Sequence, residues 1–235
     1  MLLHPFNYIA IEGPDGSGTT TVSKALTAWL NTFEPLEVKW VSEPSDEPTG
    51  RLIRSILRRE VSIAKESLLH LFIADRADLL VRIDSYLKED PNRIVISDRS
   101  YVSSHVYQQE VHDIDYIKAM HNSPHLKRPP LTLILDVKLE TALGRIQNRS
   151  SKPHEIYDDC ESIKKQINRY HSIDRHLLPM AKGLVYHIDA NRSLREVLLQ
   201  CLWRISDLWT PGRRFENKRL LDIPDSFLSY ITSAD

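Results

Sequence analysis

The chain alternates between short apolar runs and longer stretches in which apolar residues recur at helical spacing. The short runs have the length of β-strands, and they are bounded by turn-forming or charged residues. We expect strands at Tyr8–Ile11, Val38–Val41, Arg93–Ser97, Leu131–Val137 and Leu184–Ile188.

The longer stretches predict amphipathic helices at residues 65–89, 159–178 and 193–209. Strands that alternate with helices favour a mostly parallel sheet, because each crossover helix packs back onto one face of the sheet. We therefore predict an α/β fold: a three-layer sandwich with five strands and helices on both faces.

The domain organisation follows from one break in the pattern. Thr210-Pro211-Gly212 is a turn signal, and the basic pair Arg213-Arg214 comes directly after it. We expect residues 1–209 to form the main domain and residues 210–235 to form a C-terminal extension. Packing on the surface is the first interpretation of this extension, and binding to a partner is the alternative.

Composition narrows the classes of partner. The chain has 235 residues, of which 41% are hydrophobic, and a formal net charge of -1. This balance gives no reason to expect binding to nucleic acid or to an acidic membrane, but it allows a local basic cleft for a small anion. No apolar run has the length of a membrane helix, the start has no signal-peptide pattern, and the two cysteines fit no metal or disulfide pattern. We predict a soluble cytoplasmic protein.

The strongest local motif lies between the first expected strand and a helical stretch. Its residues are Gly13-Pro14-Asp15-Gly16-Ser17-Gly18-Thr19-Thr20. Glycines let backbone N–H groups approach phosphate oxygens, and the helix that follows adds the positive end of its dipole. We predict an ATP phosphate site formed by Gly13, Asp15, Gly16, Ser17, Gly18, Thr19 and Thr20, with the Thr20 hydroxyl binding Mg²⁺.

This motif departs from the P-loop pattern G-x-x-x-x-G-K-[ST] at one position, where Thr19 replaces lysine. Removing one preorganised charge of this kind costs on the order of 10²–10³ in rate, by analogy with the loss of an oxyanion donor. Lys24 is turned about 140° away from position 19 along a helix, so we do not expect it to replace the missing charge.

Several further motifs, in the same order, resemble the thymidylate kinase family over residues 7–209. They are Glu43-Pro44 with Gly50 and Leu52-Ile53-Arg54; Leu71-Phe72-Ile73-Ala74-Asp75-Arg76; Ile96-Ser97-Asp98-Arg99 with Ser103 and Val106-Tyr107-Gln108; and Leu133-Ile134-Leu135-Asp136-Val137 with Ala142-Leu143 and Arg145. The resemblance implies a homodimeric P-loop kinase that uses ATP and Mg²⁺ to convert dTMP to dTDP. A modified pyrimidine such as a 5-substituted dUMP, or a nucleotide-binding pseudokinase, remains an alternative.

The resemblance also implies roles for individual side chains. Phe72 stacks on the base and Arg76 donates to a base carbonyl; their spacing of four puts them on one helix face. Asp98 holds Mg²⁺, and Arg99 clamps the acceptor phosphate with Arg54 as a second clamp.

The remaining expected contacts surround the sugar and the transferred phosphate. Asp15 lies near the sugar 3′-hydroxyl, and the other substrate contacts are Glu43, Pro44, Ser103, Tyr107 and Gln108. A small lid is expected at about residues 145–157. Within it we assign the catalytic cation to Arg149, with Arg145 and Lys152 in support.

Three positions depart from the family pattern. Thr19 replaces the P-loop lysine and puts the catalytic rate in question. Ser42 stands where the motif REPG has arginine, so the acceptor phosphate is expected to have fewer contacts. Ser100 follows the Asp-Arg pair where many members have tyrosine, a change that we expect to be tolerated.

Overall fold

The computed structural model describes residues 6–148, 156–157, 159–177, 183–208 and 217–233. The strands are β1 (Tyr8–Glu12), β2 (Glu37–Ser42), β3 (Arg93–Asp98), β4 (Leu131–Asp136) and β5 (Leu184–Asp189). The helices are α1 (Thr19–Leu30), α2 (Pro48–Leu57), α3 (Lys65–Glu89), α4 (Tyr101–Tyr107), the short 3-10 helix η1 (Gln108–Glu110), α5 (Ile114–Met120), α6 (Leu139–Gln147), α7 (Cys160–Leu177), α8 (Leu194–Leu208), α9 (Asn217–Leu221) and α10 (Asp225–Ser233).

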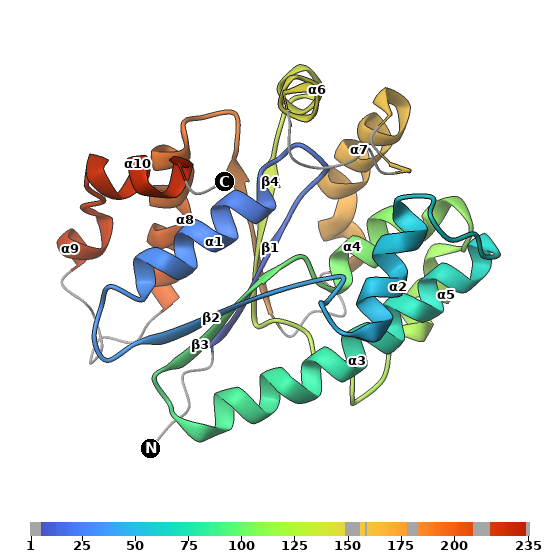
Figure 1. Cartoon of the computed structure of the whole chain (residues 1–235), viewed down its shortest axis with the longest axis horizontal. Helices are drawn as coiled ribbons and strands as arrows, with labels where there is room; N and C mark the ends of the chain where they lie inside the picture. The colour runs from blue at the N-terminus through green and yellow to red at the C-terminus, as the bar shows by residue number, and fades with distance from the viewer. Residues whose placement is uncertain (1–5, 149–155, 158, 178–182, 209–216, 234–235) are drawn as a thin grey trace.

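The strands form one sheet in the order β2-β3-β1-β4-β5, and every pairing is parallel (Figure 1). The predicted α/β class with a five-stranded parallel sheet is therefore confirmed. The central strand β1 lies between β3 and β4, where the strand order reverses. Open parallel sheets bind ligands at their carboxyl edge, beside the point where the strand order reverses. The loop after β1 lies at this position in the sheet.

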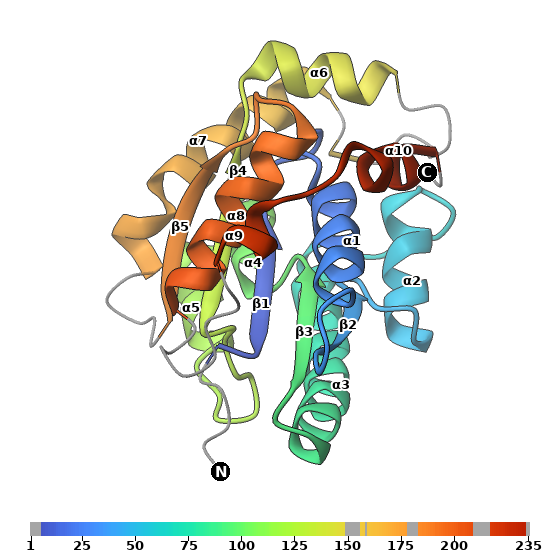
Figure 2. The same ribbon diagram turned by 90° about the vertical axis from the view of Figure 1, so that its left-hand side faces the viewer.

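The two faces of the sheet carry separate apolar cores. Ile9 and Ile11 of β1 pack with α1 and α8 on one face. Tyr8 of β1 and Val95 of β3 pack with α3 side chains in a second cluster. Helix α3 covers the face of the sheet opposite α1 (Figures 1 and 2). All five residues of β1 are buried, because helices cover both sides of this strand. The loop after β1 therefore begins at a strand that is fixed in the core.

The described part of the C-terminal extension contributes to the core beside α1 and α8. The Trp29 indole N–H donates to the Leu220 carbonyl at 2.9 Å, and its ring lies 5.0 Å from that of Phe227 between centroids. Leu220 and Ile223 are both buried with the α1 and α8 side chains. Helices α9 and α10 therefore stabilise the face of the sheet that supports α1.

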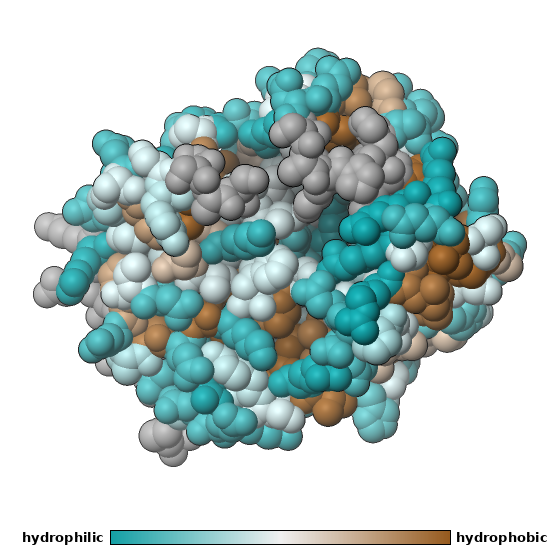
Figure 3. Space-filling model, in the orientation of Figure 1, coloured by the Kyte–Doolittle hydropathy of each residue, from teal (hydrophilic) through white to brown (hydrophobic). Residues whose placement is uncertain are grey.

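The face of the molecule in Figure 3 shows small apolar groups between polar residues. None of the described helices is both long and apolar enough to cross a membrane.

A close backbone approach at Gly50 gives a prediction for stability. A Cβ atom at Gly50 would lie 2.0 Å from the Ser45 carbonyl oxygen, whereas one at Gly144 would meet no atom within 4 Å. Gly50→Ala should lower the free energy of unfolding by about 1–3 kcal/mol through overpacking. Gly144→Ala, the matched control inside α6, should raise it by about 0.5–1 kcal/mol. Urea unfolding measures both, and equal effects of the two substitutions would contradict this packing.

Candidate active site

The loop between β1 and α1 has the geometry of an anion cradle. Gly16 and Gly18 have φ angles of 79° and 95°, which side chains with a Cβ rarely adopt. A Cβ at Gly16 would also lie 2.5 Å from the Ala142 carbonyl oxygen of α6. Gly18 is the N-cap of α1, so the first backbone N–H groups of this helix open toward the loop.

The loop opens into a cavity of about 590 Å³, a volume typical of small-molecule sites. Of the predicted residues, those that line it are Asp15, Gly16, Gly18, Thr19, Thr20, Glu43, Pro44, Arg54, Phe72, Arg76, Asp98, Arg99, Ser103, Tyr107 and Gln108. Gly13 and Ser17 do not line the cavity; the buried Ser17 hydroxyl has no hydrogen-bond partner among the described residues.

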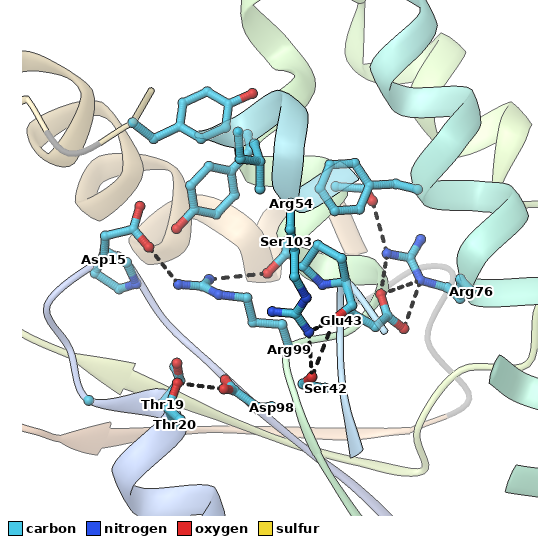
Figure 4. Close-up of a pocket in the computed structure, with 18 of the residues that line it drawn as sticks. Asp15, Thr19, Thr20, Ser42, Glu43, Arg54, Arg76, Asp98, Arg99 and Ser103 are labelled. Atoms are coloured by element: carbon cyan, nitrogen blue, oxygen red, sulfur yellow. Dashed lines mark hydrogen bonds and ion pairs between the residues drawn. The ribbon is translucent and has the colours of Figure 1, made fainter. Parts of the chain in front are cut away.

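A hydroxyl and a carboxylate meet beside the phosphate loop. The Thr20 hydroxyl donates to Asp98 Oδ2 at 2.6 Å (Figure 4). The other carboxylate oxygen, Oδ1, is buried and accepts no hydrogen bond from the described residues. Hydroxyl and carboxylate oxygens are the ligands that Mg²⁺ prefers, so this pair and its unused oxygen fit that ion.

Arg99 follows β3 and reaches back across the loop. Its backbone has a φ of 72°, an uncommon conformation for a residue other than glycine. Nη1 donates to the Gly13 carbonyl at 2.8 Å, and Nη2 pairs with Asp15 Oδ1 at 2.7 Å. The guanidinium also lies 5.2 Å from the centroid of the Tyr107 ring. The turn after β3 thus aims a fixed charge at the phosphate loop.

Arg54 of α2 lies at the cavity wall and donates to the segment that follows β2. Its Nη2 donates to the Ser42 hydroxyl at 3.1 Å, to the Pro44 carbonyl, and to Asp46 at 3.2 Å. Its Nε atom is buried without a hydrogen-bond partner among the described residues. Ser42, one of the departures from the family pattern, therefore anchors Arg54 at the cavity wall.

Arg76 and Glu43 form a buried ion pair at the opposite end of the cavity. Arg76 Nη2 lies 2.6 Å from Glu43 Oε2, and Nε donates to the same carboxylate at 2.8 Å. Both side chains are about 3% exposed, and Phe72 lies one turn before Arg76 on α3. Burial raises the pKa of Glu43, and the charge of Arg76 opposes that rise. The pair has the fork geometry of bidentate arginine–carboxylate recognition.

Glu12, the last residue of β1, was not predicted and is fully buried. It accepts hydrogen bonds from the backbone N–H and hydroxyl of Ser100, at 2.7 and 2.8 Å. The hydroxyls of Ser103 and Tyr170 donate to its other oxygen at 2.7 and 2.9 Å. Burial raises its pKa, against the lowering effects of Arg99 and these donors. The only signal in the sequence is a charged residue at the end of an apolar strand.

Helix α7 contributes a further unpredicted residue, Gln166, which contacts the phosphate loop but does not line the cavity. The Gln166 carbonyl oxygen accepts from the Asp15 backbone N–H at 2.8 Å and from the Tyr107 hydroxyl at 3.1 Å. Its amide nitrogen donates to the Tyr157 carbonyl at 3.2 Å. Gln166 therefore links the phosphate loop to α4 and to the described end of the expected lid.

Two histidines with no role assigned from the sequence, His105 and His121, are buried beside Arg76. His121 Nε2 lies 2.6 Å from Arg76 Nη1, and the His105 ring lies 5.0 Å from that of His121 between centroids. Desolvation, reinforced by the charge of Arg76, lowers the pKa of His121 to about 2. Desolvation likewise lowers the pKa of His105 to about 4. Both rings are neutral at physiological pH.

The predicted lid residues divide into two groups. Arg149 and Lys152 lie outside the described residues. Arg145 does not line the cavity: it donates to the carbonyls of Ser17 at 3.1 Å and Ala190 at 2.8 Å. Arg145 thus supports the phosphate loop from behind in this structure.

Four cationic side chains line the cavity among the described residues: Lys24, Arg54, Arg76 and Arg99. The three arginines already donate to protein oxygens. Lys24 Nζ instead lies 5.5 Å from the centroid of the Trp40 ring. Thr19 supplies no charge, so the lysine normally found in a P-loop has no direct replacement at that position.

A phosphate loop that shares one cavity with the buried Arg76 and the half-buried Arg54 and Arg99 is typical of P-loop kinases that act on small phosphorylated acceptors. The family model for thymidylate kinase matches residues 11–200. A probable thymidylate kinase of Methanococcus aeolicus is 33% identical over 85% of this chain and 96% of its own length. Another, from Methanosphaera stadtmanae, is 37% identical over 69% of this chain and 81% of its own. The chain belongs to the thymidylate kinase family and is a nucleoside-monophosphate kinase.

The buried histidines predict a steep acid dependence of stability. Their folded-state pKa values lie below the ordinary value, so the unfolded chain binds more protons and stability falls as pH falls below about 6.5. Each histidine contributes about 1.4 kcal/mol per pH unit to this slope until the pH nears its folded-state pKa. His121→Gln should therefore reduce the slope by about that amount between pH 6 and 5. Urea unfolding across this range checks it, and parallel slopes for the two proteins would contradict it.

Proposed function

We propose that the protein transfers the γ-phosphoryl group of ATP to a pyrimidine deoxynucleoside monophosphate, with dTMP as its main acceptor. The observation that carries the proposal is the layout of one cavity. The phosphate loop with Thr20 and Asp98 lies at one end and the buried Arg76 at the other (Figure 4). Phe72, which also lines the cavity, lies one turn before Arg76 on α3. Family membership and the names of the relatives support the same acceptor.

In this mechanism the protein positions charges and forms no covalent intermediate. Thr20 and Asp98 would hold Mg²⁺, and the ion would supply positive charge to the phosphates. Arg99 clamps the acceptor phosphate beside the loop, exchanging part of its pairing with Asp15 for the ligand. Arg54, anchored on Ser42, provides the second clamp.

The base and sugar would occupy the cavity between these groups. Phe72 offers a ring for stacking, and Arg76 offers a hydrogen-bond donor to a base carbonyl. Asp15, Tyr107 and Gln108 would line the sugar. The amide nitrogen of Gln108 is buried and has no acceptor in the described part of the chain, which suits a ligand contact.

The charge that Thr19 lacks is assigned to Arg149 of the lid, as proposed from the sequence. A lid residue approaches only when the nucleotides are bound, so it adds charge during transfer. The retained Asp98, Arg99 and Arg76 favour a working kinase over a pseudokinase, since a scaffold needs no acceptor site. The homodimer is proposed from the resemblance, and the cytoplasmic location is proposed from composition. A modified pyrimidine such as a 5-substituted dUMP is the alternative acceptor.

The proposed activity is tested with purified protein, ATP, Mg²⁺ and a panel of dTMP, dUMP, a 5-substituted dUMP, dCMP and purine monophosphates. Diphosphate formation should be fastest with a pyrimidine that carries a 4-carbonyl group. Asp98→Asn should lower kcat by about 10² or more, because Mg²⁺ loses a charged ligand. The absence of diphosphate above a buffer control for every acceptor would overturn the proposal.

Restoring the lysine tests whether the missing charge limits turnover. Thr19→Lys should raise kcat by about 10-fold to 10²-fold, since a charge on the β- and γ-phosphates stabilises the transition state. In the wild type, Arg149→Met should lower kcat far more than Lys24→Met, its control among the cavity cations. Steady-state kinetics with dTMP measures all three. An equal or larger loss for Lys24→Met would move the assignment to that residue, and no gain for Thr19→Lys would show that charge is not limiting.

A further inference from the structure

The orientation of the His121 ring is fixed by two hydrogen bonds. His121 follows α5 as its C-cap and is 2% exposed. Its Nδ1 lies 2.8 Å from the Ile117 carbonyl oxygen, which can only accept, so Nδ1 carries the proton. Nε2 is therefore the acceptor of the neutral ring, and it receives an N–H from Arg76 Nη1 at 2.6 Å.

The surroundings of the His121 ring keep Nε2 unprotonated, so that it can accept a hydrogen bond. Burial, the charge of Arg76 and the nearby His105 ring all oppose protonation of His121. A protonated ring would place an N–H against the guanidinium, with two like charges in a dry site. His121 therefore acts as a fixed hydrogen-bond acceptor throughout the physiological pH range.

Arg76 has five N–H donors, and four of them have an acceptor among the described residues. The Nε donor and one Nη2 donor go to Glu43, and the other Nη2 donor goes to the Ser104 hydroxyl at 3.0 Å and the Ser100 carbonyl at 3.2 Å. One Nη1 donor goes to His121. The last Nη1 donor has no acceptor among the described residues, and Arg76 lines the cavity.

We propose that His121 is a positioning residue that leaves Arg76 a single N–H for the base and thereby selects pyrimidines with a carbonyl at position 4. This inference rests on the proposed function, in which Arg76 contacts the base. One remaining donor matches the 4-carbonyl of thymine or uracil. Cytosine carries an amino group there, which would meet that donor with its own N–H and leave both unpaired. Without His121, Arg76 Nη1 would rotate, and both of its N–H donors would be available to other acceptors.

Two substitutions of His121 separate the acceptor from the volume of the ring. His121→Gln keeps an acceptor oxygen near the position of Nε2, whereas His121→Met fills similar space without a comparable acceptor. His105→Met is the matched control, because His105 is equally buried and its ring lies 5.0 Å from that of His121 between centroids, but the structure gives it no hydrogen bond to Arg76. Urea unfolding of each variant establishes how much stability each substitution removes.

Calorimetric binding of dTMP and dCMP, with KM and kcat for dTMP and ATP, decides the proposal. His121→Met should weaken dTMP binding and raise its KM about tenfold, leave the KM for ATP within about twofold, and reduce the preference for dTMP over dCMP. His121→Gln and His105→Met should stay within about threefold of the wild type for dTMP.

Two kinds of result would overturn the proposal. Equal dTMP affinity for wild type and His121→Met, or an equal loss for His105→Met, would make His121 a purely structural residue. Either result leaves the proposed function intact. If the wild type binds neither nucleotide, the proposed function fails, and the inference about His121 fails with it.

Discussion

The site depends most on one buried carboxylate, that of Glu12. It ends the central strand β1, has no exposure to solvent, and is satisfied by donors from α4 and α7. An unpaired charge in such a place costs several kcal/mol, so the elements that carry these donors must close around it. Buried ion networks are weak evidence for stability, but this one fixes the position of the turn after β3. Ser100, a departure from the family pattern, supplies two of the donors.

The turn after β3 connects the two ends of the cavity. Arg99 precedes Ser100 and reaches the phosphate loop, whereas the Ser100 carbonyl accepts from Arg76 at the opposite end of the cavity. Arg76 is in turn held by Glu43 and His121. A short chain of buried polar contacts therefore fixes the position of Arg99 relative to Arg76. In-line phosphoryl transfer needs such fixed spacing, because positioning supplies much of the catalysis.

The sequence was sufficient for the features that depend on local pattern. The strands, the long helix α3, the phosphate loop and the Asp98-Arg99 turn all follow from periodicity or short motifs, and the structure has the predicted fold. The roles of Glu12, Gln166 and His121 depend on partners that the fold brings from 45 to 158 residues away. No local pattern contains that information. Arg145 shows the converse, since its place near the lid does not reveal that it faces the back of the loop.

The claim that one cavity orients a pyrimidine monophosphate between Arg76 and Arg99 is tested most directly by a crystal structure with dTMP, Mg²⁺ and a non-hydrolysable ATP analogue. The structure should have the base against Phe72, its 4-carbonyl within 2.7–3.2 Å of Arg76 Nη1, and its phosphate on Arg99. His121 should retain its contact with Arg76. A base bound elsewhere, or an Arg76 that contacts only protein atoms while dTMP is bound, would contradict the claim.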